Sequence, residues 1–276
     1  MALVFRIAAN GGGGGGGGSY ITPFAYYDFE TGGTQYVTNV LGTNNYTGSF
    51  SSDTDGITNF GLDSDPAFSG SNSVQFPSGY DARSLNLGTP SERSNWGTLF
   101  SGSFSVSAWV YFPMTEGNAY MLNNYRIFGN LEGNDTYGFY FGTYRGQPMV
   151  YSRGASSGHS SVAYWGNDDS SNYQGWNHFV FVVDGDTDAT NRRFKMFINN
   201  TDFGYADDSQ AGRYFQKQFL DDENVYFGNN FVGTKQATMN FDEISIWSTA
   251  LSTGQVNVLY NNGTGSYALT ALTQSS

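Results

Sequence analysis

A strict alternation of side chains between residues Phe104 and Phe112 restricts the fold of this chain more than any other feature. One face carries Phe104, Val106, Ala108, Val110 and Phe112, and the other carries Ser105, Ser107, Trp109 and Tyr111. A period of two residues is that of a β-strand with one face toward a core, because successive side chains point to opposite sides of a sheet. The pattern predicts a long strand in an antiparallel sheet.

The rest of the chain continues this β pattern in short aromatic and β-branched segments, which are separated by clusters of Gly, Asn, Asp and Ser. Strands are predicted at Phe24–Phe29, Ser73–Phe76, Tyr125–Phe128, Tyr137–Phe141, Met149–Tyr151, Trp176–Val183, Phe194–Ile198, Val225–Phe227 and Met239–Trp247. One helix is predicted, beginning at the capping box Ser252-Thr253-Gly254-Gln255 and ending before Gly263. The number of strands is enough for two packed sheets, so we expect an all-β antiparallel sandwich with a short C-terminal helix.

Composition excludes several classes of function. Charged residues are 13% of the chain, against about 25% in an average protein, and the formal net charge is −12. That charge repels nucleic acids and anionic membranes. The chain has no cysteine, which removes disulfides, thiolate metal sites and a cysteine nucleophile. No stretch of about eighteen apolar residues is present to span a membrane.

Four regions follow from the composition along the chain. Residues 1–10 form a short apolar segment, residues 11–19 a glycine linker, residues 20–265 the β domain and residues 266–276 a tail. Glycine loses the most backbone entropy on ordering, so the run predicts a flexible tether; a packed polyglycine element is the alternative. The apolar Leu3, Val4, Phe5 and Ile7 are strand-like and predict an anchor that adds a strand to a partner's sheet or fills a groove. A disordered terminus is the alternative.

Taken in order, the strand sequences resemble the laminin-G-like branch of the concanavalin A-like jelly rolls. The matching pieces are Ala25–Glu30, Ser73–Phe76, Phe104–Val110, Trp176–Gly185, Lys195–Asn199 and Phe241–Ser252. The family includes lectins, adhesins, glycoside hydrolases, lyases and structural modules, so the resemblance implies a fold and, by analogy, glycan binding.

No catalytic motif accompanies the resemblance. Retaining hydrolases on a related jelly roll carry Glu-x-Asp-x-x-Glu, which places two carboxylates close together on one face. The nearest match is Glu132-Gly133-Asn134-Asp135, which lacks the second glutamate. The histidines His159 and His178 have no nucleophile motif beside them. We therefore expect no enzymatic activity, while carboxylates brought together from distant strands leave a glycoside hydrolase or polysaccharide lyase as the alternative.

The resemblance also implies a structural calcium ion. Many sandwiches of this type hold an ion where the opening strand meets the closing strand, which in this chain implicates Asp28 and Asp242. Oxygen ligands suit calcium and need neither cysteine nor histidine. The alternative for Asp242 is a cap on a neighbouring turn.

Aromatic residues make up 17% of the chain, and they provide the candidate glycan site. A partly exposed tyrosine or tryptophan can stack on the apolar face of a sugar ring while neighbouring polar groups bind its hydroxyls. The candidates lie in or beside the loop-rich region 142–175, and they are Tyr144, Tyr151, Tyr164, Trp165 and Tyr173. The alternative for each is packing in the core or pairing across strands.

These observations predict a non-enzymatic interaction module. We expect a virion surface protein of a phage, such as a capsid decoration protein, fibre or tail appendage, held to a larger protein assembly by its N-terminus. The β domain would face outward and contact host glycans, and homo-oligomers, trimers especially, are expected because virion parts occur in many copies. A bacterial cell-surface adhesin is the alternative location.

Overall fold

The structure is a computed structural model, and it describes residues 20–21, 23–30, 36–37, 48–52, 62–63, 73–76, 83–89, 95–112, 125–131, 138–144, 147–153, 160–164, 173, 175–184, 193–205, 224–229, 239–260, 263 and 272–273. The N-terminal segment, the glycine run and the anchor residues Leu3, Val4, Phe5 and Ile7 lie outside these ranges. Neither described helix is long and apolar enough to cross a membrane.

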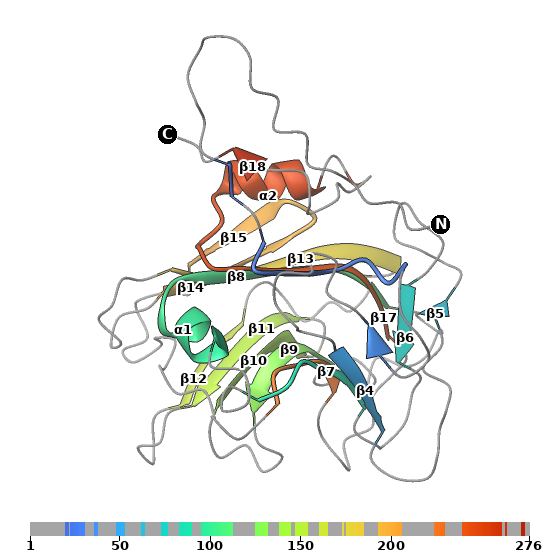
Figure 1. The fold of residues 1–276 in the computed structure, drawn as a ribbon. Helices are drawn as coiled ribbons and strands as arrows, with labels where there is room; N and C mark the ends of the chain where they lie inside the picture. Colours follow the sequence, from blue (N-terminus) through green and yellow to red (C-terminus); the bar gives the residue numbers. More distant parts are fainter. Residues whose placement is uncertain are drawn as a thin grey trace.

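Two antiparallel eight-stranded sheets form the layers of the described part of the chain (Figure 1). Sheet I has the order β12-β11-β10-β9-β16-β7-β4-β3. Its strands are β3 (Tyr36–Val37), β4 (Gly48–Ser52), β7 (Arg83–Asn86), β9 (Tyr125–Leu131), β10 (Gly138–Tyr144), β11 (Gln147–Arg153), β12 (Ser160–Tyr164) and β16 (Tyr226–Asn229). The layers are those of a β-sandwich, so the expected fold class is confirmed.

Sheet II has the order β15-β14-β13-β8-β17-β6-β5, and β2 pairs with β17 beside β6. Its strands are β2 (Ala25–Tyr27), β5 (Leu62–Asp63), β6 (Ser73–Phe76), β8 (Phe104–Phe112), β13 (Gly175–Asp184), β14 (Arg193–Ile198), β15 (Thr201–Tyr205) and β17 (Met239–Trp247). A separate pair joins β1 (Tyr20–Ile21) to β18 (Leu272–Thr273). The bounds predicted for β6, β8 and β17 are confirmed, whereas the opening strand stops at Tyr27 because the backbone turns at Phe29, where φ is 56°.

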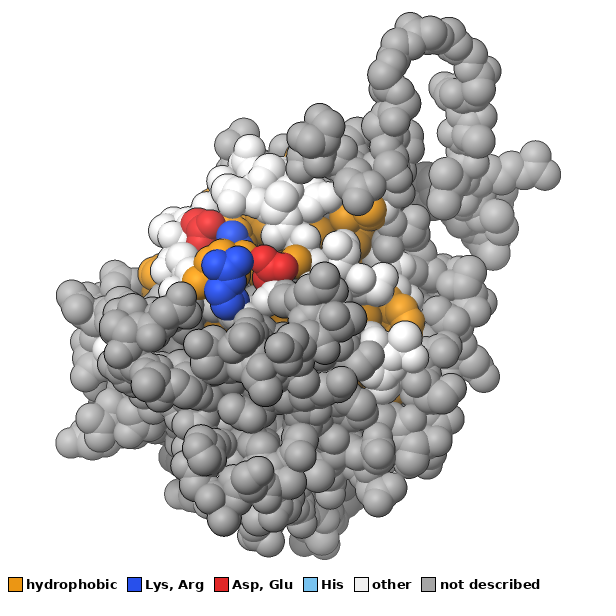
Figure 2. All heavy atoms as spheres, turned by 90° about the vertical axis from the view of Figure 1, so that its left-hand side faces the viewer, with side chains coloured by type: hydrophobic (Ala, Val, Ile, Leu, Met, Phe, Trp, Pro, Cys, Tyr) orange, Lys and Arg blue, Asp and Glu red, His pale blue; other side chains and the backbone are white. Residues whose placement is uncertain are grey.

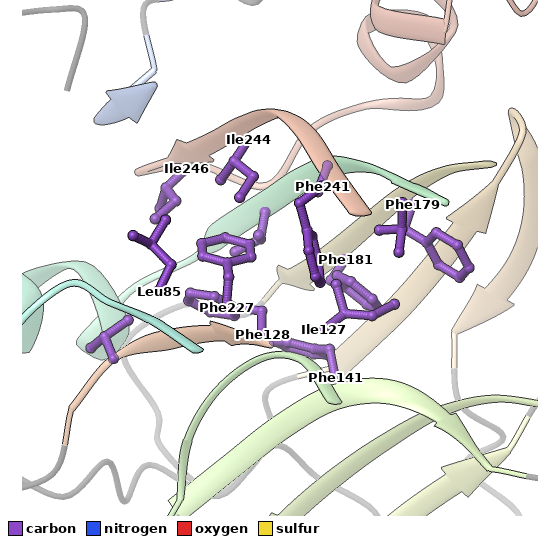
Figure 3. Close-up of a cluster of buried hydrophobic side chains, with 14 of the residues drawn as sticks. Leu85, Ile127, Phe128, Phe141, Phe179, Phe181, Phe227, Phe241, Ile244 and Ile246 are labelled. Atoms are coloured by element: carbon purple, nitrogen blue, oxygen red, sulfur yellow. The ribbon is translucent and has the colours of Figure 1, made fainter. Parts of the chain in front are cut away.

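The core lies between the two sheets, and phenylalanine is its commonest residue (Figure 3). The inward face of β8 is the one predicted, since Phe104, Val106, Ala108, Val110 and Phe112 are all buried in it. The sheets meet ring to ring: Phe141 of β10 stacks on Phe181 of β13 with centroids 4.6 Å apart. Aromatic pairs at this distance add to the stability that burial alone supplies.

Two helices cover the sandwich. The predicted helix is α2 (Thr253–Tyr260), and its capping box is formed: Gln255 N–H donates to Ser252 Oγ at 3.3 Å, and Ser252 N–H donates to Gln255 Oε1 at 2.8 Å. The expectation of a single helix is wrong, because α1 (Asn95–Ser101) precedes β8. That helix has no acidic residue in its first turn and no basic residue in its last; burial of Trp96, Leu99 and Phe100 holds it at one side of the layers (Figure 1).

Charged side chains lie on and beside the edge strand β15 of sheet II. Lys195 Nζ lies 3.1 Å from Asp202 Oδ2 and 5.1 Å from the centre of the Tyr205 ring. Arg193 stacks over the same ring at 4.3 Å, and the Tyr205 hydroxyl donates to Asp184 at 2.7 Å. Figure 2 shows basic side chains between acidic ones on this part of the surface. Charged side chains on an edge strand oppose pairing with another sheet.

Candidate functional site

One cross-strand row on the outer face of sheet I gathers aromatic and polar residues from six strands. Register places Tyr151 opposite Tyr140, Tyr140 opposite Gly129, Gly129 opposite Tyr226, and Tyr226 opposite Asn86, which in turn pairs with Ser49. We call these six residues the tyrosine row. The row faces away from the core because its strand neighbours Phe139, Phe141, Val150, Leu85 and Phe227 point inward.

The end of the row at β10 and β11 is a stacked ladder. The rings of Tyr140 and Tyr151 are 5.3 Å apart with an interplanar angle of 20°. The guanidinium of Arg126 in β9 lies over the ring of Tyr140, 4.5 Å from its centre. Arg126 and Tyr140 are each 6% exposed, whereas Tyr151 remains partly exposed. The ladder therefore fixes the orientation of Tyr151 and leaves that ring as the accessible member.

Gly129 allows the middle of the row to close. A Cβ at this position would lie 2.7 Å from the carbonyl oxygen of Phe139, 2.8 Å from Tyr140 Cβ and 2.9 Å from the hydroxyl oxygen of Tyr226. These separations are shorter than real Cβ contacts, so no larger residue fits without a shift. The missing side chain lets the Tyr226 hydroxyl approach Tyr140.

Small polar groups form the other end of the row. Asn86 is partly exposed, its Oδ1 accepts a hydrogen bond from Ser84 Oγ at 3.1 Å, and Ser49 is exposed. The strands of sheet I contain Arg83, Arg126 and Arg153 but no aspartate or glutamate. Aromatic rings, amide and hydroxyl groups and an arginine therefore share a surface whose strands carry no negative charge, although the chain is acidic.

The predicted glycan residues occupy different surroundings. Tyr151 belongs to the ladder, whereas Tyr173 packs at the edge of the core with its ring 6.2 Å from that of Phe179. Tyr144 pairs with Gln147 and Tyr164 with Met149 in the sheet, but their side chains are outside the described part, as is the whole of Trp165. The structure therefore does not bring the five candidates together in one cluster among the described side chains. Tyr140 and Arg126, which form the ladder with Tyr151, were not among the predicted residues.

The residues around Tyr151 that were not predicted differ in how clearly the sequence indicates their position. The alternation of Phe139, Tyr140 and Phe141 indicates that Tyr140 points outward from a buried strand. The alternation of Val225, Tyr226 and Phe227 gives Tyr226 the same outward direction, but its place opposite Gly129 depends on β16 pairing between β9 and β7. Arg126 lies in the predicted strand Tyr125–Phe128, and its stacking partner Tyr140 lies on another strand.

The predicted calcium residues lie at a junction of β2 and β17. Ile244 to Ile246 pair with β2, and an irregularity between Asp242 and Ser245 inserts Glu243, whose φ is 50°. Asp242 Oδ1 accepts the Glu243 N–H at 2.8 Å, and Asp28 Oδ1 accepts the Glu30 N–H at 3.1 Å. Asp242 therefore makes a local hydrogen bond to the backbone, as the alternative to calcium binding predicts.

Burial dominates the electrostatics of this junction. Desolvation raises the pKa of Glu243 to about 9; the hydrogen bond from the Tyr26 hydroxyl opposes this rise, and the charges of Asp242 and Asp28 add to it. Desolvation also raises the pKa of Asp28 and of Tyr26. Among the described residues, no three Asp, Glu or His side chains converge to hold a metal ion. A calcium ion at Asp28 and Asp242 would need backbone or other oxygens as well, and it stays a prediction.

His178 belongs to the packing beneath α2. It is 2% exposed, its Nε2 is 2.8 Å from Ser107 Oγ, and its ring lies 5.2 Å from Trp109 and 6.1 Å from Tyr260. Desolvation lowers the pKa of His178 to about 3. The ring is therefore neutral at physiological pH and enclosed by aromatic side chains.

Comparison with known proteins agrees with this architecture. Residues 68–257, more than half of the chain, match the model of the concanavalin A-like lectin/glucanases superfamily. No curated protein matches the chain.

Several solved structures share the fold at low sequence identity. One is the receptor-binding domain of the botulinum neurotoxin C/D mosaic serotype, with a TM-score of 0.59 and 14% identity over 87% of this chain and 51% of that chain. A botulinum neurotoxin type C structure, reported with cell entry that depends on two ganglioside molecules, gives 0.56 and 15% over 88% and 51%. The binding domain of Paraclostridial Mosquitocidal Protein 1 gives 0.58 and 12% over 87% and 52%. The chain spans about half the length of these structures, and the likeness shows the fold alone.

Proposed function

Because the chain belongs to the concanavalin A-like lectin/glucanases superfamily, we propose that it is a non-enzymatic module that binds glycans on the outer face of sheet I. The observation that carries this proposal is the ladder of Arg126, Tyr140 and Tyr151. A ring held in place by its neighbours loses little conformational entropy when a sugar stacks on it. Asn86 and Ser49, in the same row, supply polar groups for hydroxyls of the ligand.

The chemistry of the ladder favours a glycan that carries an acidic group. Arg126 is only 6% exposed, so its positive charge attracts a carboxylate or sulfate near the ladder without having to contact it. The strands of sheet I contain no aspartate or glutamate. The negative charge of the whole chain opposes long polyanions, so the ligand we propose carries few charges.

The positions of the described carboxylate groups support a module without enzymatic activity. The described carboxylates that influence one another are Asp28, Glu30, Asp242 and Glu243, all at the junction of β2 and β17 in sheet II. Asp242 is fully buried and Glu243 is 5% exposed. Glycoside hydrolysis needs two carboxylates on either side of a reachable bond, so this cluster does not serve the tyrosine row.

Binding of a glycan panel to the full chain, followed by titration calorimetry, tests the site. Tyr151→Ala removes the stacking ring and is expected to weaken binding about 5- to 150-fold, taking the about 1–3 kcal/mol of base–aromatic stacking as the scale. Tyr151→Phe should retain most of the affinity. Tyr205→Ala, which removes a partly exposed tyrosine of sheet II, is the matched control.

Equal affinity of Tyr151→Ala and the unchanged chain would refute the site. Turnover of any panel member by the unchanged chain would refute the non-enzymatic assignment. Preference for neutral over acidic members would refute the role given to Arg126.

We place the module on a virion surface, attached to a larger assembly through residues 1–10. The support is the order of the sequence, in which an apolar segment and a glycine run precede the sandwich strands. Removal of residues 1–18 should abolish attachment to particles and leave the thermal unfolding of the β domain unchanged. Attachment that survives the deletion would contradict this location and leave the bacterial surface as the better setting.

A further inference from the structure

A pocket of about 310 Å³ opens where α1, the start of β8 and the end of β17 meet. None of its lining residues belongs to the tyrosine row, so the inference below is independent of the proposed function. Phe24, Thr98, Leu99, Ser103, Ser248 and Thr249 line it, together with Gly102.

The apolar part of the pocket is held in place by the fold. Phe24 is half-buried; its N–H donates to the carbonyl of Ile246 at 2.6 Å, and its ring contacts Trp96 with centroids 5.4 Å apart. Leu99, from α1, is 4% exposed. A ligand therefore meets a fixed ring beside a fixed aliphatic side chain.

Four of the lining residues carry a hydroxyl group. Thr98 and Ser103 come from α1 and the turn after it, and Ser248 and Thr249 come from the segment after β17. In the described part of the chain, the hydroxyls of Ser248 and Thr249 form no hydrogen bond with other residues. Backbone contacts hold the segment instead: Thr249 O accepts from Ser105 Oγ at 2.8 Å, and Ser105 Oγ accepts from Leu251 N–H at 2.9 Å.

The described residues of the lining include no charged side chain, so none of them offsets the desolvation of an ionic ligand. A ligand that fits has an apolar face for Phe24 and Leu99 and hydroxyls at its rim. Its size is limited, because small-molecule pockets range from about 300 to 1,000 Å³ and this one is at the lower limit. We propose that the pocket binds a single neutral hexopyranose unit, free or at the end of a glycan.

Gly102 offers a direct way to close the pocket. A Cβ added there meets no atom within 4 Å, and Gly102 is not among the glycines with positive φ. Gly102→Ala should therefore be tolerated, and Gly102→Trp should fill the pocket from its wall. Circular dichroism and thermal unfolding verify that both variants remain folded.

Saturation-transfer NMR with the methyl glycosides of glucose, galactose, mannose and N-acetylglucosamine tests the proposal on the full chain. We expect at least one glycoside to bind, Gly102→Ala to retain it, and Gly102→Trp to weaken it at least tenfold. Ser248→Ala combined with Thr249→Val should weaken it without changing the melting temperature. Tyr151→Ala should leave it unchanged, which separates this pocket from the tyrosine row.

Three outcomes would overturn the proposal: no glycoside binds, Gly102→Trp binds as well as the unchanged chain, or N-acetyl-leucine amide binds and the sugars do not. The last result would identify a pocket for an apolar side chain of a protein partner. Loss of binding in Tyr151→Ala together with retention in Gly102→Trp would assign the sugar to the tyrosine row and likewise refute the pocket.

Discussion

The two outer faces of the sandwich differ in the side chains they carry and in what packs on them. The outer face of sheet II lies under α2, where Tyr26, Val180, Val182, Phe197 and Trp247 form a second core with Leu251, Val256 and Leu259 (Figure 1). The outer face of sheet I instead presents the tyrosine row, with Tyr151, Asn86 and Ser49 not fully buried. We propose that the same alternation of side chains along strands serves stability on one face and ligand contact on the other. Helix α2 closes the outer face of sheet II, whereas on sheet I Tyr226 and Tyr140 are buried and Tyr151 remains partly exposed.

The largest expected effect comes from removing a side chain of the second core. Trp247 is fully buried, and its indole N–H donates to Ser245 Oγ at 3.0 Å. Trp247→Ala should lower the free energy of unfolding by about 3–5 kcal/mol, as is typical of buried aromatic truncations. Tyr151→Ala on the other face should lower it by less than about 1 kcal/mol. Guanidinium unfolding measures both, and equal losses would contradict the division of roles.

Gly129 tests whether the tyrosine row is as closely packed as a core. Gly129→Ala places a methyl group against Phe139 O and the Tyr226 hydroxyl, so it should lower the free energy of unfolding by about 1–3 kcal/mol and weaken glycan binding. Gly254→Ala is the matched control on α2, where the nearest atom is Ser252 Oγ at 4.0 Å. There the same methyl should stabilise the helix by about 0.5–1 kcal/mol. Stabilisation by Gly129→Ala would show that the row is loosely packed.

We expect His178, in the packing beneath α2, to make the free energy of unfolding depend on pH. The folded-state pKa is lowered from 6.5 to about 3, so the unfolded chain takes up the proton first as pH falls. Its contribution to stability is therefore complete above pH 6.5 and decreases toward pH 3, with a loss of about 2 kcal/mol by pH 5. His178→Gln should flatten the curve of unfolding free energy between pH 7 and 5 by that amount. An unchanged slope would mean that the buried ring is not kept neutral.

The smallest effect concerns the predicted calcium ion at the junction of β2 and β17. If Asp28 and Asp242 bind calcium, saturating calcium chloride should raise the melting temperature by a few degrees relative to EDTA, because ligand that binds the folded state adds stability by mass action. Asp28→Asn should abolish that rise. No difference between calcium and EDTA would assign the two carboxylates to the backbone hydrogen bonds they already form.

Sequence reasoning found elements that carry a clear local signal and missed elements that do not. The strands β6, β8 and β17 and the helix α2 were predicted because alternation and a capping box act locally. Helix α1 and the two-residue strands β3 and β5 were missed, since tertiary burial or pairing forms them. In the candidate site, the sequence predicted Tyr151, and alternation indicated that Tyr140 points outward. The contacts of Tyr226 and Arg126 and the pocket at Phe24 depend on segments far apart in the chain.

The sequence by itself determined which side chains of β8 face the core, where α2 begins, and that the chain lacks thiolate chemistry and a retaining-hydrolase motif. These are local properties of period, capping and composition. The tertiary structure alone decided that β16 lies between β9 and β7, that Glu243 is inserted opposite β8, and that α2 covers sheet II. The physical reason is that strand order and helix docking depend on total burial across the sandwich, and no local pattern encodes that total.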